Sequence, residues 1–432
     1  MPLIRSIGRW SLTALIINGV IGSGVFGIPS EVNGIVGRAS PIAMILAGLG
    51  MGMVMACFAE VASQFSNAGG AYLYTKTALG DFAGMQVAWF SLLAPVGACA
   101  ASVNLFVIYL AGFLPAVGSG VLRLAVMALL LGALTLANYV GVRSGTNLSN
   151  VFTVSKLLPL VVLILLGLWR FMEHPLMLPP NEVMQPGIRG WLDALLLLAF
   201  AYGGFETCLI PAAEMKEPRK QIPLALVSGL LVCVGVYALI QFVVVVTIGT
   251  GHVDRPLAAA ASVLIGSSGS ALITAAAMIS IYGSVSAMVL ATPRLTFSLA
   301  ESREFPSIFA AVHPRFRTPH VSIVAIGTLA LLLAATGTFR WLMTLASGAI
   351  IITYTAVCIS LIVLRRRNPE ADALRIPGGT WIACACMVVA VILLSRFTAR
   401  EAVLLVITAI IASLNFLIVR GRRLRKVEEL QV

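Results

Sequence analysis

The sequence predicts an all-α membrane protein with about a dozen spanning helices. Its 432 residues are 59% hydrophobic and only 11% charged, with a mean hydropathy of +1.00. This composition excludes a soluble fold with a polar surface for most of the chain. Since a crossing takes about 20 apolar residues, the connections between most spans must be short. The predicted spans are residues 10–31, 41–64, 81–114, 121–141, 149–169, 191–213, 223–249, 270–298, 321–337, 341–364, 378–395 and 401–419.

The net charge of +12 indicates an orientation in the membrane and not a nucleic-acid partner. With the N-terminus inside, most Lys and Arg fall on the cytoplasmic side, including the run 365–367 and the basic tail 420–432. Glycines interrupt the first apolar stretch, which lacks the cleavage site of a signal peptide, so it reads as the first span. We therefore expect a multi-pass protein with both termini cytoplasmic. Its compact loops and short tails favour the plasma membrane of a prokaryote, a bacterial inner membrane.

Two spans are interrupted in similar ways. The first reads NGVIGSGVFGIPS from Asn18 to Ser30, and the sixth reads LAFAYGGFETCLIPAAE from Leu198 to Glu214. Glycine lowers helix stability by about 1 kcal/mol relative to alanine, so both helices should open at their glycines. Unpaired backbone groups cannot face lipid, so each opened segment should line a cavity or a bound solute. The alternative is that these glycines only allow close helix packing.

The spacing of the interruptions predicts an internal repeat. Five spans lie between the start of the first interrupted helix and the start of the second, and an odd number of spans per repeat inverts the second half. We expect a single transporter-like domain over 1–432. It should contain a first inverted repeat at 10–169, a second at 191–364, two additional helices at 378–419 and the tail 420–432.

Short motifs along nearly the whole chain resemble the amino acid–polyamine–organocation (APC) transporter superfamily. Each motif is weak alone, and their order and spacing make the match. They are Gly22-Ser23-Gly24-Val25-Phe26, Asn67-Ala68-Gly69-Gly70-Ala71-Tyr72, Phe200 to Glu206, Glu214 with Glu217-Pro218-Arg219 and Ile222-Pro223, Arg294 through Phe305-Pro306, His313, Thr318-Pro319, Arg365 to Arg367, and Arg375-Ile376-Pro377.

The resemblance implies a LeuT-like fold with the substrate site between the broken first and sixth helices. Ser23 and the amides of Gly22 and Gly24 would receive a carboxylate, and carbonyls near Val20, Phe200 and Gly203 would receive an ammonium group. Free N–H groups at a helix start and free carbonyls at a helix end suit such a zwitterion. The substrate-binding residues expected on this basis are Val20, Gly22, Ser23, Gly24, Phe26, Phe200, Tyr202, Gly203 and Gly204.

Lys156 is the most informative ionisable residue within the spans. An intramembrane lysine costs about 2.5–3.5 kcal/mol on insertion scales, so it should either find partners or lose its proton. In proton-coupled, sodium-independent relatives a lysine at this position takes the place of a sodium ion and bonds to the opened first helix. We therefore expect Lys156 to couple protons to transport, without sodium. The alternative is a lysine that only reaches back to the interface.

Other polar and aromatic residues near the breaks allow two interpretations each. Glu206 could carry protons or could anchor the loosened backbone. Glu60 is better explained as the structural partner of a loop Lys or Arg. Phe26, Phe200 and Tyr202 could close over a bound solute or could be ordinary packing residues.

The sequence predicts neither an enzyme nor a metal or cofactor site. No P-loop, nucleophile elbow or zinc-protease motif is present. The seven cysteines lie in or beside apolar segments, and Cys384 and Cys386 form only a C-x-C pair without further ligands. We expect no disulfides and no bound metal.

These observations predict a secondary transporter of neutral or apolar L-amino acids, driven by protons through alternating access. The expected partners are the amino acid, protons and membrane lipids, with no nucleic acid. Obligate exchange, export, or transport of polyamines would fit the same sequence. In a different class, the chain could be an amino acid sensor that does not transport.

Overall fold

A computed structural model describes residues 9–65, 69–141, 146–173, 186–208, 218–367 and 373–431. The described chain is helical throughout, without a strand. Its α-helices are α1 (Arg9–Val20), α2 (Gly24–Val36), α3 (Ser40–Ala62), α4 (Gly70–Leu79), α5 (Asp81–Leu110), α6 (Gly120–Val140), α7 (Thr146–Glu173), α8 (Ile188–Ala201), α9 (Pro218–Ile248), α10 (Pro256–Glu301), α11 (His320–Thr336), α12 (Phe339–Arg367), α13 (Gly379–Leu394) and α14 (Ala399–Gln431).

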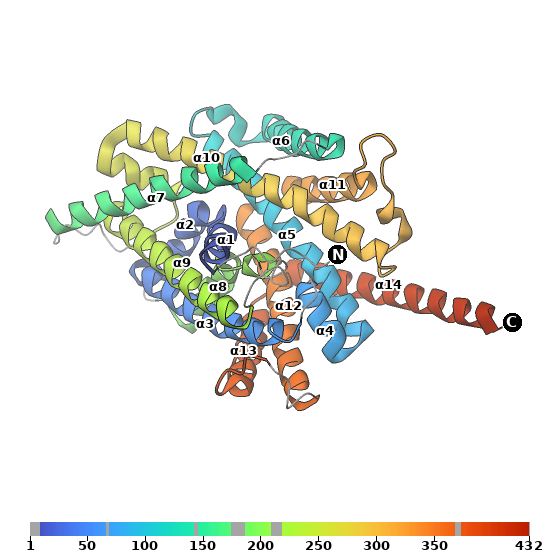
Figure 1. The fold of residues 1–432 in the computed structure, drawn as a ribbon. Coiled ribbons are helices and arrows are strands. Elements are labelled where there is room, and N and C mark those ends of the chain that lie inside the picture. The colour runs from blue at the N-terminus through green and yellow to red at the C-terminus, as the bar shows by residue number, and fades with distance from the viewer. Residues whose placement is uncertain are drawn as a thin grey trace.

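The helices pack as a bundle in which α1, α2 and α8 lie near the centre (Figure 1). Helix α1 packs on α9, α2 packs on α8, and α12 packs on α5, α8 and α3. Large apolar side chains cover much of the outer surface, among them Leu129, Leu165, Leu231 and Val391, which are each at least 60% exposed. Water would penalise such a surface, whereas lipid does not.

The all-helical prediction is confirmed. Among the described residues, eight helical segments are long and apolar enough to cross a membrane, and three shorter apolar helices accompany them. Both predicted interruptions are present: the first span divides into α1 and α2, and the helix of the sixth span ends at Ala201. The predicted range 191–213 was therefore too long for one helix. Glu214 and the motif residues 67–68 lie outside the described residues.

Three helical features differ from the prediction. Helix α4 was not expected as a separate element, because its ten residues are too short and too polar to span. Helix α10 begins at Pro256, well before the predicted span 270–298, and it bends at Ile265 and Gly266, where the glycine has φ of 75°. Helix α14 continues through the predicted tail to Gln431 and extends away from the bundle (Figure 1).

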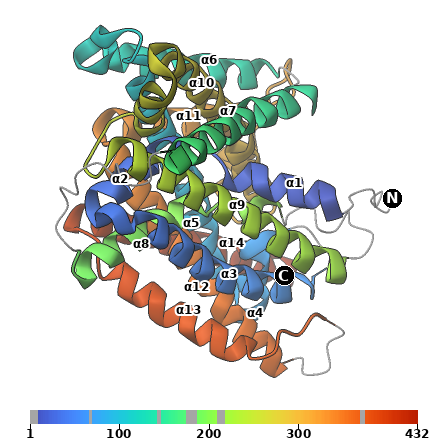
Figure 2. The same ribbon diagram turned by 90° about the vertical axis from the view of Figure 1, so that its left-hand side faces the viewer.

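Helices α12 and α13 both pack on α3, and α13 lies along the lower edge of the bundle in Figure 2. A buried ion pair fixes this corner: Arg365 donates to both carboxylate oxygens of Glu60 at 2.5 and 2.6 Å. The Glu60 side chain is 1% exposed, and it also accepts the Ile376 amide at 2.9 Å. The structural interpretation of Glu60 thus has a definite partner, which lies at the end of a helix and not in a loop.

Replacing Arg365 with alanine should strongly destabilise the protein, because it leaves the buried Glu60 carboxylate without its cation. Breaking one side of a buried ion pair typically costs about 3–5 kcal/mol. We expect a clearly lower melting temperature of the purified protein in detergent. The exposed neighbour Arg366 supplies the control, and equal melting temperatures for Arg365→Ala and Arg366→Ala would contradict the assignment.

Candidate functional site: two broken helices

The first helix break occupies Ile21 to Ser23. Helix α1 ends at Val20, and the Gly22 amide turns back to donate to the Val20 carbonyl at 2.8 Å. Helix α2 starts at Gly24, so the first N–H groups of α2 have no acceptor within the helix. The positive end of the α2 dipole therefore points into the break.

The second break follows the end of α8 at Ala201. The chain passes through Gly204, which has φ of 100°, and forms a short turn over 205–208. Glu206 stabilises this turn, because its Oε2 accepts the Gly204 amide at 2.9 Å and the Tyr354 hydroxyl at 2.7 Å. These bonds favour the interpretation in which Glu206 anchors the loosened backbone.

The two breaks lie directly against each other. A Cβ atom on Gly204 would come within 2.7 Å of the Gly19 carbonyl oxygen, and one on Gly19 within 3.0 Å of the Cys208 sulfur. The Cys208 thiol also donates to the Leu15 carbonyl at 3.3 Å. Glycines at 19 and 204 are thus required for this close contact between the segments on either side of the two breaks.

Lys156 of α7 bonds to the first break, as the resemblance implied. Its ammonium group donates to the Asn18 carbonyl at 3.1 Å and to the Ile21 carbonyl at 2.9 Å. The side chain is 6% exposed. Because α1 ends at Val20, these two carbonyls lack regular helical hydrogen bonds. The Lys156 ammonium group satisfies both acceptors, which lipid could not do.

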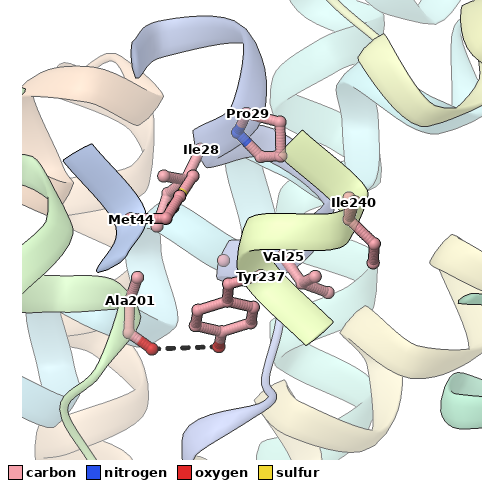
Figure 3. Close-up of a pocket in the computed structure, with 8 residues that line it drawn as sticks. Val25, Ile28, Pro29, Met44, Ala201, Tyr237 and Ile240 are labelled. Atoms are coloured by element: carbon pink, nitrogen blue, oxygen red, sulfur yellow. Dashed lines mark hydrogen bonds between the residues drawn. The ribbon is translucent and has the colours of Figure 1, made fainter. Parts of the chain in front are cut away.

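Tyr237 of α9 joins the two breaks and was not predicted. Its hydroxyl oxygen lies 2.8 Å from the Val20 carbonyl oxygen and 3.0 Å from that of Ala201, and its proton is shared between them. Figure 3 shows the bond to Ala201 at the base of a small apolar pocket. A lone tyrosine in an apolar helix gives no signal in the sequence, because its partners come from two distant segments. The pocket is lined by Gly24, Val25, Ile28, Pro29, Met44, Ala201, Tyr237 and Ile240.

Serine hydroxyl groups from α5 and α10 lie near the first break and the start of α2. Ser23 Oγ lies 2.6 Å from Ser102 Oγ of α5, and Ser102 donates its own proton to the Ala98 carbonyl, so Ser23 is the donor in this pair. Ser284 of α10 lies 3.8 Å from the Cβ position of Gly22. Ser102 and Ser284 were also missed by the sequence analysis.

The three predicted aromatic residues have different surroundings. Phe26 is fully buried against Tyr109, whose hydroxyl donates to the Phe26 carbonyl at 2.9 Å. Tyr202 is also buried, and its hydroxyl donates to the Met44 carbonyl of α3 at 2.8 Å. Phe200 is only partly buried and lies 3.3 Å from the Cβ position of Gly24. Of the three, Phe200 is the ring placed at the first break.

Not all the predicted backbone groups are open in this conformation. The Val20 carbonyl accepts hydrogen bonds from the Gly22 amide and from the Tyr237 hydroxyl. The Phe200 carbonyl accepts a hydrogen bond from the Gly203 amide at 3.3 Å. Gly203 itself faces Ile350, which lies 2.9 Å from its Cβ position. The start of α2, with Ser23 beside it, offers the donors, and the end of α8 offers the negative end of a helix dipole.

A helical membrane bundle with two broken helices in contact is typical of a secondary transporter. A family model described as "Amino acid permease" matches residues 7–420. The chain belongs to this amino acid permease family.

Characterised relatives agree with this assignment. The serine/threonine exchanger SteT of Bacillus subtilis is 29% identical over 385 residues, which cover 87% of each chain. The methylthioribose transporter of the same organism is 29% identical over 398 residues, covering 87% of this chain and 84% of the relative. The branched-chain amino acid permease BcaP of B. subtilis is 25% identical over 400 residues, with coverage of 87% and 84%. The family and these relatives are membrane transporters and not enzymes.

Gly204→Ala should disrupt the contact between the breaks. The positive φ costs about 1–2 kcal/mol for a residue with a side chain, and the overlap with the Gly19 oxygen adds about 1–3 kcal/mol. We expect a lower melting temperature and loss of substrate uptake. Gly235→Ala on α9 is the control, since a Cβ there meets no atom within 4 Å. Equal uptake by the two variants would contradict the requirement for glycine.

Tyr237→Phe removes the hydroxyl that bridges the breaks while keeping the ring. Leaving buried acceptors unpaired costs about 1–3 kcal/mol, so we expect the initial rate of uptake to fall about tenfold or more. Tyr139→Phe on α6 is the matched control. Uptake that stays at the native level in Tyr237→Phe would show that the bridge is not needed.

Proposed function

We propose that this permease carries L-amino acids with neutral or apolar side chains, coupled to protons and independent of sodium, by alternating access. The observation that carries the proposal is the pair of hydrogen bonds from the Lys156 ammonium group to the Asn18 and Ile21 carbonyls.

The coupling follows from what a lysine can donate. A protonated Lys156 has three N–H donors and a full charge, and it holds the first break against α7. A neutral Lys156 gives weaker bonds, because charge-assisted hydrogen bonds are about twice as strong as neutral ones. Loss of the proton would therefore loosen α1 and α2 from α7. The same carbonyls are hard oxygen ligands suited to sodium, and the ammonium group occupies them.

The surroundings of the α2 start support a substrate without a charged side chain. The described side chains next to Ser23 and Gly24 carry no charge: they are Ser102, Ile28 and Phe200. The substrate carboxylate would bind the free amides at the start of α2, and its ammonium group would face the end of α8. The names of SteT and BcaP, which specify serine, threonine and branched-chain amino acids, support the same class.

The proposed architecture has two inverted repeats, residues 10–169 and 191–364, followed by helices within 378–419. The basic residues 365–367 and the tail 420–432 would lie with both termini in the cytoplasm of a bacterial cell, and the protein in its inner membrane. Glu206 would serve the second break as an anchor, with proton transfer as a second role. Lipids would surround the apolar outer faces of the bundle.

The second candidate is obligate exchange, in which Lys156 keeps its proton and only braces the core. The similarity to an exchanger, SteT, favours this alternative specifically. Export, polyamine transport and a non-transporting sensor remain compatible with the fold and lack an observation of their own.

Lys156→Ala in proteoliposomes distinguishes the two candidates. We expect an inward proton gradient to drive accumulation of radiolabelled serine or leucine by the native protein and not by the variant. Arg170→Ala, at the exposed end of the same helix, should behave like the native protein. Sodium should change nothing.

Three outcomes would contradict the leading proposal. Exchange that ignores the gradient in the native protein would make it an antiporter. Gradient-driven uptake that survives in Lys156→Ala would remove Lys156 from the coupling. Transport of none of a full panel of amino acids would refute the substrate class.

A further inference from the structure

Three cysteines from separate helices meet inside the bundle, and none of them belongs to the residues of the two helix breaks. They are Cys57 of α3, Cys358 of α12 and Cys386 of α13, and their sulfur atoms all lie within 4.8 Å of one another. All three are buried, with exposed fractions of 1%, 1% and 8%, and all three are free thiols. Cys384, the other member of the C-x-C pair, does not belong to the group.

The triangle of sulfur atoms has the size of a metal site. The centre of an equilateral triangle with a 4.8 Å edge lies about 2.8 Å from each corner, and metal–thiolate bonds are about 2.3 Å long. Inward shifts of about 0.5 Å would therefore bring all three sulfur atoms to bonding distance of one ion.

The surrounding structure holds the three thiols in place. Helices α3, α12 and α13 pack pairwise on one another, and the Glu60–Arg365 ion pair ties the same three segments together. Glu60 lies about one turn beyond Cys57, and Arg365 about two turns beyond Cys358. Arg365 also donates a hydrogen bond to the Ile376 carbonyl at 2.7 Å, so the segment that leads into α13 is fixed as well. Such support reduces the cost of assembling a ligand set.

We propose that Cys57, Cys358 and Cys386 form a binding site for one soft, thiophilic metal ion. Thiolate sulfur selects soft ions over magnesium, calcium or sodium. Three ligands fit three-coordinate ions such as copper(I) or cadmium better than a structural zinc, which takes four.

Binding is an exchange of protons for the metal. Each thiol that bonds to the ion releases its proton to solvent, so up to three protons leave for each ion bound. Three thiolates with a divalent ion carry a net charge of −1. The Arg365 guanidinium, which interacts electrostatically with Cys57, stabilises that charge although Glu60 partly offsets it. Affinity should fall as the pH is lowered.

The site can be tested with cadmium as the probe on the purified full-length protein, kept reduced with a phosphine. We expect one equivalent of cadmium to produce an ultraviolet sulfur-to-metal charge-transfer band and to raise the melting temperature. Cys57→Ser, Cys358→Ser and Cys386→Ser should each weaken binding by at least about 100-fold. Cys384→Ser and the buried Cys99→Ser should bind cadmium like the native protein.

X-ray absorption of the native complex keeps the test decisive if a serine variant fails to fold. Three sulfur neighbours around cadmium would support the site, and fewer than three would overturn it. The proposal also fails if the native protein shows no saturable binding, or if Cys384→Ser weakens binding as much as Cys386→Ser. Because the cysteines lie outside the breaks, these results are independent of whether Lys156 couples protons.

Discussion

The structure depends on one constraint: a helix that opens inside a membrane must find new partners for its backbone within the protein. Two helices open here, and several of the exposed carbonyl and amide groups have a specific side-chain partner. Lys156 takes the Asn18 and Ile21 carbonyls, Tyr237 takes those of Val20 and Ala201, and Glu206 takes the Gly204 amide. Two side chains from other helices, Lys156 and Tyr237, and one from the second break itself, Glu206, thus replace hydrogen bonds that the breaks remove.

The same constraint explains why the breaks suit a transported solute. Some groups at each break are satisfied by the protein, and the start of α2 keeps donors available beside Ser23. Phe200 lies 3.3 Å from the Cβ position of Gly24, so the positive end of α2 and the negative end of α8 lie in one region. In the proposed mechanism a small zwitterion binds both ends, and its removal leaves a core that still has internal partners. A site built this way can be emptied and refilled without unfolding.

The sequence predicted the fold class and the position of both breaks, because apolar periodicity and clustered glycines are local signals. It also placed Lys156 near the first break through the family resemblance. It could not predict Tyr237, Ser102 or the Arg365 partner of Glu60, since each contact joins residues more than 75 positions apart.

The expectations about cysteine show the same limit. The C-x-C pair of Cys384 and Cys386 offers no ligand set by itself, and the sequence could not indicate that three sulfur atoms from three helices meet. Adjacent spacing on a helix places residues i and i+2 on different faces, so only one of the pair could join a common cluster. The helix α4 and the part of α10 before its bend at Ile265 were missed for a related reason: each is too short to be a membrane span by itself, so neither stands out in a search for spans.

The most direct test of the central claim is an experimental structure of the protein with a bound neutral amino acid. The account predicts the substrate carboxylate at the amides that begin α2, beside Ser23, and the ammonium group toward the end of α8. Substrate bound without any contact to the amides that begin α2 would contradict it.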